Sequence, residues 1–106
     1  MEKTTNLKDY NIYAGLGGSF GGANYIGTLR DSNLEEAEKY AYEVACEEYD
    51  SYAGSHGLRT VDEIMEDETL DERDAYETYL QEMEDWIECY VIPTDEDDLE
   101  EKIIEL

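Results

Sequence analysis

The chain has 106 residues, 41% of them hydrophobic and 11% aromatic, and its 30 acidic residues outnumber its 7 basic residues to give a formal net charge of -23. This length indicates one domain with a modest core, and the apolar and aromatic content excludes a disordered acidic tail. A surface with this charge repels nucleic acid and anionic membranes, so it favours a strongly basic protein as the partner. All of the net charge lies in residues 32–106, because the acids and bases of residues 1–31 cancel.

Two strands are predicted near the N-terminus, over residues 9–16 and 23–29. Apolar and aromatic side chains alternate with polar ones in the first strand, which is typical of a strand with one buried face. In the second strand we expect Tyr25 and Leu29 on one face. The two strands would pair as a β-hairpin.

Residues 14–23, which span the end of the first strand, the turn and the start of the second strand, hold five of the chain's 8 glycines. We favour a flexible hairpin turn; the alternative is a mobile tip bearing Phe20 that enters a partner. Nucleotide binding is disfavoured, because a strand rather than a helix follows the glycines and no basic residue lies among them.

A helix is predicted over residues 33–53. Ser32 with Glu35 forms a capping-box pattern at its start, and Gly54 is a natural stop at its end. Its apolar face at helical spacing comprises Leu34, Ala37, Ala41, Val44, Ala45 and Tyr52.

Two further capping-box patterns, Thr60 with Glu63 and Thr69 with Glu72, predict a short helix and then a long one. The long helix carries an apolar stripe and is expected to end at Pro93. The stripe comprises Tyr76, Tyr79, Leu80, Met83, Trp86, Ile87, Tyr90 and Val91.

A last short helix is expected at the C-terminus, capped by Thr94 or Asp95. Its apolar residues would be Leu99, Ile103 and Leu106. With no internal repeat and no linker, the sequence predicts a single α+β domain over residues 1–106. In this fold an N-terminal β-hairpin packs with three to four α-helices.

The sequence carries no targeting signal that we recognise. Residues 1–8 are polar with no apolar stretch behind them, so we expect no signal peptide, and no apolar run is long enough to cross a membrane. We therefore expect a cytoplasmic protein. Cys46 and Cys89 would then be reduced thiols, with a disulfide between them as the minor alternative.

Nothing in the sequence favours an enzyme, a cofactor or a metal site. His56 is the single histidine and is interpreted as a surface loop residue. Cys46 has no basic neighbour to lower its pKa, and one histidine with two distant cysteines does not fit a structural zinc site. The acidic residues 94–101 lack the central glycine of an EF-hand loop.

The acidic helix faces are the strongest functional signal. A net charge of magnitude about 2 to 8 suffices for the solubility of a small domain, and this chain far exceeds it. Carboxylates one helical turn apart are spaced by about 5.4 Å, comparable with the phosphate spacing of about 3.4 Å along a DNA strand. The residues expected to bind a partner in this way are Glu36, Glu43, Glu47, Asp50, Asp71, Asp74, Glu77, Glu82, Asp85 and Glu88.

The N-terminal segment resembles the start of the ArdA-type antirestriction proteins. These open with a hydrophobic–Tyr strand and Ala-x-Leu, then a glycine-bearing turn with an aromatic residue and a second strand. The residues that carry the resemblance are Ile12, Tyr13, Ala14, Leu16, Gly17, Phe20, Gly22, Gly27 and Leu29. The composition also resembles phage and mobile-element DNA mimics, including anti-CRISPR proteins. This resemblance implies a mode of action, in which the protein occupies the basic DNA-binding groove of a defence nuclease. Our hypothesis is that the target is a CRISPR effector or restriction complex in the cytoplasm of a host bacterial cell.

Two other interpretations stay open at this point. One is a small interaction module without DNA mimicry, which would bind a protein through Tyr40, Tyr42, Tyr49 and Tyr52, since tyrosine is enriched at interfaces. The other is a halophilic protein whose acidity serves solubility. A homodimer is also left open.

Overall fold

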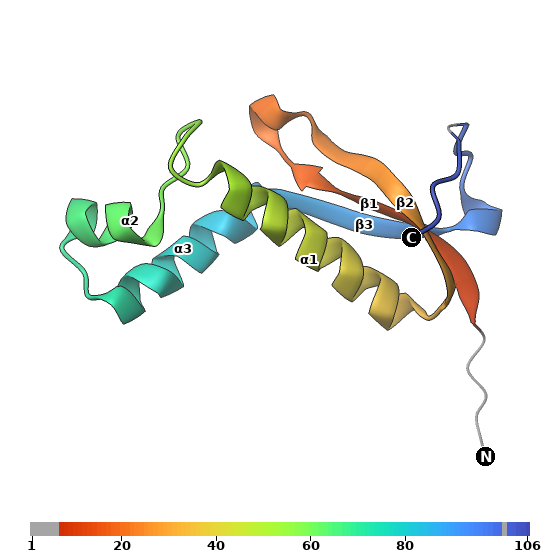
Figure 1. Cartoon of the computed structure of the whole chain (residues 1–106), viewed down its shortest axis with the longest axis horizontal. Coiled ribbons are helices and arrows are strands. Elements are labelled where there is room, and N and C mark those ends of the chain that lie inside the picture. The colour runs from red at the N-terminus through yellow and green to blue at the C-terminus, as the bar shows by residue number, and fades with distance from the viewer. Residues whose placement is uncertain (1–6, 101) are drawn as a thin grey trace, which may run out of the picture.

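A three-stranded antiparallel sheet and three helices make up the computed structural model, which describes residues 7–100 and 102–106 (Figure 1). The strands lie in the order β2-β1-β3, and α1 packs on one face of the sheet. Helices α2 and α3 extend beyond the end of the sheet, so that the molecule measures 51 × 37 × 17 Å. The elements are β1 (Lys8–Leu16), β2 (Gly22–Ser32), α1 (Leu34–Tyr52), α2 (Val61–Glu68), α3 (Glu72–Trp86) and β3 (Ile87–Pro93), with single 3-10 turns at Gly18–Phe20 and Thr94–Glu96.

The predicted hairpin is confirmed as β1 and β2. Side chains of β1 alternate as expected, and Tyr10 and Ile12 face the core. The expectation that Tyr25 and Leu29 share a face is wrong. A bulge interrupts the register, because Ile12 pairs with Gly27 whereas the next residue of β1 pairs with Tyr25. This extra residue in β2 turns Tyr25 to the face away from α1, while Leu29 packs in the core.

The long helix predicted up to Pro93 is wrong beyond Trp86, where a third strand begins. Ile87 already has extended backbone angles, φ -71° and ψ 144°. Ile87–Pro93 then pairs antiparallel with the whole of β1. The segment is rich in β-branched residues, and tertiary pairing with the open edge of β1 outweighs the apolar helical spacing. Glu88 therefore lies on a strand and not on the flank of a helix.

The predicted last helix is also wrong. Thr94–Glu96 forms one 3-10 turn, and the described residues that follow it are not helical. Asp97 anchors this segment to the sheet, since its Oδ2 accepts hydrogen bonds from Asn11 Nδ2 at 2.8 Å and from the Tyr13 hydroxyl at 2.6 Å. Further on, the N–H of Leu106 donates to the carbonyl oxygen of Thr28 at 2.9 Å, beside the outer edge of β2.

One of the three predicted capping boxes is confirmed. Thr60 and Glu63 form a complete capping box at the start of α2. Ser32 is the last residue of β2 and is buried, so Asn33 caps α1 in its place. Thr69 takes a left-handed conformation with φ 54° that ends α2, and Asp71 caps α3.

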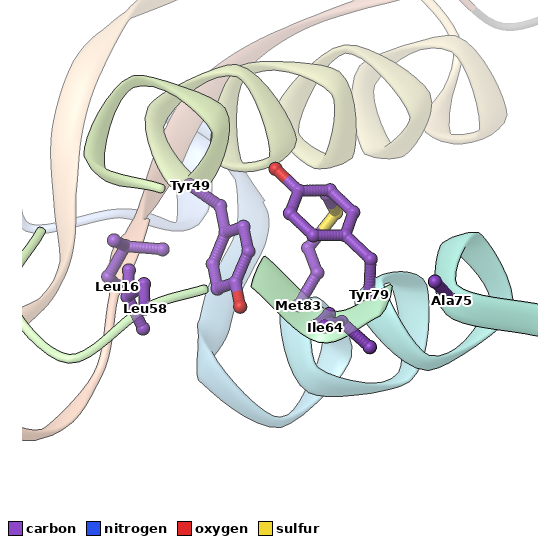
Figure 2. Close-up of a cluster of buried hydrophobic side chains, with 7 residues drawn as sticks. All are labelled: Leu16, Tyr49, Leu58, Ile64, Ala75, Tyr79 and Met83. Atoms are coloured by element: carbon purple, nitrogen blue, oxygen red, sulfur yellow. The ribbon is translucent and has the colours of Figure 1, made fainter. Parts of the chain in front are cut away.

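Two buried clusters hold the chain together. The first lies between α1 and the sheet and comprises Tyr10, Ile12, Ala37 and Ala41. The second lies where the end of α1 meets α2 and α3, and Figure 2 shows it. It comprises Leu16, Tyr49, Leu58, Ile64, Ala75, Tyr79 and Met83.

The buried face of α1 differs from the prediction at both ends. Ala37, Ala41 and Ala45 are buried as expected, but Leu34 is 50% exposed because it lies at the first turn, at the margin of the sheet. Tyr49 was not predicted to be in the core and is wholly buried. Its ring packs edge-on against Tyr79 of α3 at a centroid distance of 5.4 Å, so it contributes to the contact between α1 and the α2–α3 pair.

Replacing Tyr49 by phenylalanine is expected to raise the free energy of unfolding by about 1 kcal/mol. The Tyr49 hydroxyl is buried and has no hydrogen-bond partner among the described residues, and an unsatisfied buried polar group costs about 1–3 kcal/mol. Urea unfolding of both proteins measures the difference. A loss of stability in Tyr49→Phe would contradict the buried, unpartnered position of this hydroxyl.

Candidate acidic interface

The glycine-rich turn is held against the C-terminal end of α3. Positive φ values of 62°, 97° and 88° at Gly18, Gly21 and Gly22 place these residues in the region that favours glycine. The N–H of Gly17 donates to the carbonyl oxygen of Trp86 at 2.8 Å. The glycines therefore serve the backbone geometry of a hairpin turn.

Phe20 lies in an aromatic cluster and not on an exposed tip. Its ring centroid is 4.9 Å from that of Tyr52 and 5.8 Å from those of His56 and Trp86. The side chain is half-buried and packs against the second core cluster. The aromatic residue in the glycine turn thus ties the hairpin to the end of α1 and to α3.

The carboxylates predicted on α1 all lie on its exposed surface. Glu36, Glu43 and Glu47 are exposed, and within the described residues no basic side chain pairs with them. Asp50 is exposed too, but it accepts a hydrogen bond from the Tyr79 hydroxyl of α3. Glu36, Glu43 and Glu47 are therefore exposed on α1 and, among the described residues, carry no ion pair, as is also the case for Glu35 and Glu38.

The carboxylates predicted on α3 fall into two groups. Asp74, Glu77 and Asp85 are exposed along the helix. Asp71 is exposed as well but caps the helix, where its Oδ1 accepts the N–H of Asp74 at 2.9 Å. Glu82 is half-buried and paired with a cation, so it is the least available member of the predicted set.

Arg59, in the loop before α2, neutralises a local group of carboxylates. Its guanidinium pairs with Glu82 of α3 and with two residues at the end of α2, Asp67 at 3.4 Å and Glu68 at 2.7 Å. The hydrogen bonds that Arg59 donates to the carboxylates of Glu82 and Glu68 raise the pKa of Arg59. Arg59 therefore ties α2 to α3 at a point where like charges would otherwise repel.

Carboxylates of α2 were missing from the predicted interface. Glu63 completes the capping box, but Asp62 and Glu66 are exposed next to it. A hydrophobic residue at every third or fourth position, with acids between, already marks this helix in the sequence. Asp62 and Glu66 therefore add to the exposed acidic surface that the carboxylates of α1 and α3 form.

Glu88 is displaced from the expected acidic row. Its side chain lies against the glycine turn, so that a Cβ added at Gly17 would be 2.5 Å from Glu88 Oε2 and one at Gly22 would be 3.0 Å from Oε1. The exposed side chain of Glu88 is flexible and can move aside, so the positive φ of Gly22 is the stronger reason for glycine there, and Gly17 with φ -80° has no backbone requirement for glycine.

Alkaline pH is expected to destabilise the protein through Tyr79. Burial, and then the hydrogen bond to Asp50, raise the pKa of Tyr79 above its usual value of 10.0. Above about pH 10 the unfolded chain loses this proton while the folded chain keeps it, so the free energy of unfolding falls as pH rises. Urea unfolding between pH 9 and 12 measures the slope. In Tyr79→Phe the decline should be shallower by up to about 1.4 kcal/mol per pH unit; an unchanged slope would contradict the assignment.

Three further properties concern the described part of the chain: metal binding, membrane spanning and the reactivity of the two thiols. No group of three or more His, Cys, Asp or Glu in it is arranged to hold a metal ion, and none of its helices is both long and apolar enough to cross a membrane. Cys46 and Cys89 are unbonded and half-buried, and burial raises the pKa of both thiols. Thiols in this state are weak nucleophiles at neutral pH.

The sheet face away from α1 carries a row of tyrosines that the sequence analysis did not identify. Tyr13 and Tyr90 stack with a centroid distance of 4.7 Å and an interplanar angle of 11°. Tyr25 lies on the other side of Tyr13 at 5.8 Å. One tyrosine from each strand thus forms a continuous aromatic strip, and the bulge in β2 is what brings Tyr25 into it.

Comparisons of the chain with protein-family models, with curated proteins and with solved structures gave no match.

Proposed function

We propose that this protein is a DNA-mimicking inhibitor that binds the basic DNA-binding groove of a host defence protein, a CRISPR effector or a restriction enzyme. The observation that carries the proposal is the exposure of carboxylates on the outer faces of α1 and α3 in a molecule 51 Å long. At about 3.4 Å per base-pair step, this length corresponds to about 15 steps of a DNA duplex.

The scarcity of neutralising cations supports the same proposal. In the described residues only Arg30 and Arg59 form ion pairs, and their partners lie outside α1. A surface that served solubility alone would intersperse both signs of charge. An array of unpaired carboxylates instead attracts a basic groove over a long range and competes with DNA for it.

The resemblance of residues 12–29 to ArdA-type antirestriction proteins and the general likeness to phage DNA mimics favour this class of target. In the proposed complex, Glu36, Glu43, Glu47, Asp74 and Glu77 stand in for phosphates. The hairpin turn with Phe20 acts as scaffold, because its aromatic cluster is already packed.

A pull-down with two elution arms tests the proposal. The tagged protein is incubated with bacterial lysate supplemented with restriction complexes and CRISPR effectors, and bound proteins are eluted by a salt gradient or by duplex DNA. Elution of a DNA-binding enzyme by both is the expected result, since ionic contacts weaken with salt. A partner that resists both would favour the tyrosine-rich interaction module.

That second candidate function rests on the strip of Tyr13, Tyr25 and Tyr90. Of the four tyrosines first considered for such a module, Tyr49 is wholly buried and does not contribute. The strip is a better aromatic surface, because Tyr90 is 48% exposed and tyrosine is enriched at protein interfaces.

A further inference from the structure

The outer edge of β3 is an unpaired sheet edge. Strand β3 pairs with β1 on one side, and no described residue pairs with its other side. Alternate residues along such an edge direct backbone N–H and C=O groups outward, where they are free to pair with another chain. Proteins usually protect an edge with lysines, prolines or bulges, whereas β3 has a regular register and carries proline only at its last position.

A groove of about 490 Å³ runs beside this edge, between β3 and α1. Its lining is mainly apolar, and Cys89 and Val91 of β3 face Ala41 and Tyr42 of α1 across it. Residues on the α1 side of an added strand would place their side chains in this groove. Residues on the opposite side would lie near Tyr90 and continue the aromatic strip.

The charges around the groove identify the kind of segment that fits. Glu38 and Lys39 line it. Burial and then the charge of Glu38 raise the pKa of Cys89. With Glu88 on the strand itself, carboxylates outnumber the single lysine. A second copy of the chain would bring another net charge of -23 to this edge, and like charges brought together destabilise association.

We propose that the β3 edge binds an extended segment of a partner protein that carries lysine or arginine at alternate positions, by strand addition to the sheet. Apolar side chains of the segment enter the groove beside α1, and its basic side chains lie on the other face near Tyr90 and Glu88, where a cation is attracted both by the ring and by the carboxylate. The inference rests on the proposed function only for the basic character of the partner.

A synthetic peptide tests the site without a natural target. The probe is an acetylated and amidated heptapeptide of alternating lysine and valine, and the readout is amide hydrogen exchange measured by NMR on the full chain. With free peptide at about ten times its dissociation constant, the outward-facing amides of β3 are expected to exchange about tenfold more slowly. Binding with protection confined to α1, α2 and α3, or no binding at low salt, would overturn the proposal.

Two controls separate strand addition from general attraction between charges. The same peptide with N-methyl groups on alternate backbone nitrogens keeps its charge but cannot complete the ladder, and it should bind about tenfold more weakly. Glu88→Lys should weaken the unmodified peptide about threefold to tenfold, because Glu88 lies with Tyr90 on the face of β3 that would receive the basic side chains. The matched variant Glu72→Lys, at an exposed position at the start of α3, should change binding by less than about twofold. Equal effects of the two variants would contradict the site.

The outcomes also distinguish this proposal from the proposed function. Capture of a DNA-binding enzyme that leaves the β3 amides unprotected would uphold the DNA mimic and overturn strand addition. Protection of β3 by the peptide, with no enzyme captured in the pull-down, would support the binding site at the β3 edge and contradict the proposed DNA mimicry. A dimer that protects β3 in the absence of peptide would overturn the choice of occupant in favour of a second copy.

Discussion

Reversing the charge of four helix carboxylates together is expected to weaken binding to a DNA-binding enzyme captured in the proposed pull-down by about 100-fold. The variant combines Glu43→Lys and Glu47→Lys on α1 with Asp74→Lys and Glu77→Lys on α3, all of them exposed. Each reversal replaces an attraction to the basic groove by a repulsion. A total loss of about 3 kcal/mol of binding free energy over four exposed sites corresponds to a loss of affinity of about 100-fold. Isothermal titration calorimetry at fixed salt measures the affinity.

A matched variant controls for the change in net charge. Asp95, Glu96, Asp98 and Glu100 are also exposed, but they lie in the C-terminal segment and not on a helix face. Reversing them changes the formal net charge from -23 to -15, as the four reversals on the helices do. We expect a loss of less than about fivefold for this control, since it changes only the long-range attraction. Equal losses in the two variants would mean that total charge, rather than the helix faces, determines binding.

Replacing Ile12 by alanine is expected to lower the free energy of unfolding by about 4 kcal/mol. Ile12 is wholly buried at the centre of the middle strand, where it pairs with Gly27 on one side and Val91 on the other. It packs against Ala37 and Ala41 of α1, which are too small to fill the space that the substitution opens. Truncation of a buried isoleucine to alanine costs about 2–5 kcal/mol, and the cost is high where the site cannot collapse.

The conservative substitution at the same position provides the control. Ile12→Val removes one methylene and should cost about 1 kcal/mol in the same urea unfolding measurement. Domains of this size have a free energy of unfolding of about 5–15 kcal/mol, so Ile12→Ala is expected to leave a small margin of stability. A cost below about 1.5 kcal/mol for the alanine variant would contradict the position of Ile12 at the centre of the core.

The acidic helix faces and the hairpin were predictable because their signals are local. Alternation of apolar and polar residues marks β1, and the capping box of Thr60 and Glu63 marks the start of α2. The exposed rows of α1 follow from helical spacing alone. These features depend on residues within one or two turns, so one sequence is enough to find them.

The third strand and the aromatic strip were not predictable in the same way. Ile87 and Val91 continue the apolar spacing of α3, and only the open edge of β1, more than 70 residues earlier in the chain, makes extended pairing the better choice for them. Tyr25 reaches the strip through a bulge beside Gly27. An isolated glycine in a strand pattern is a sign of a bulge, but it does not specify which residues change face. Tyr49 was missed because it lies one turn beyond the run of buried alanines on α1, among acidic neighbours.

DNA mimicry requires that this protein and DNA compete for one groove on the target. The competition is measured by titrating the protein into a complex of the enzyme captured in the pull-down with a fluorescently labelled duplex, and by following fluorescence anisotropy. We expect complete displacement of the duplex, with an apparent affinity whose logarithm falls linearly with the logarithm of the salt concentration. A stable ternary complex, in which the duplex and this protein are bound to the enzyme together, would contradict DNA mimicry.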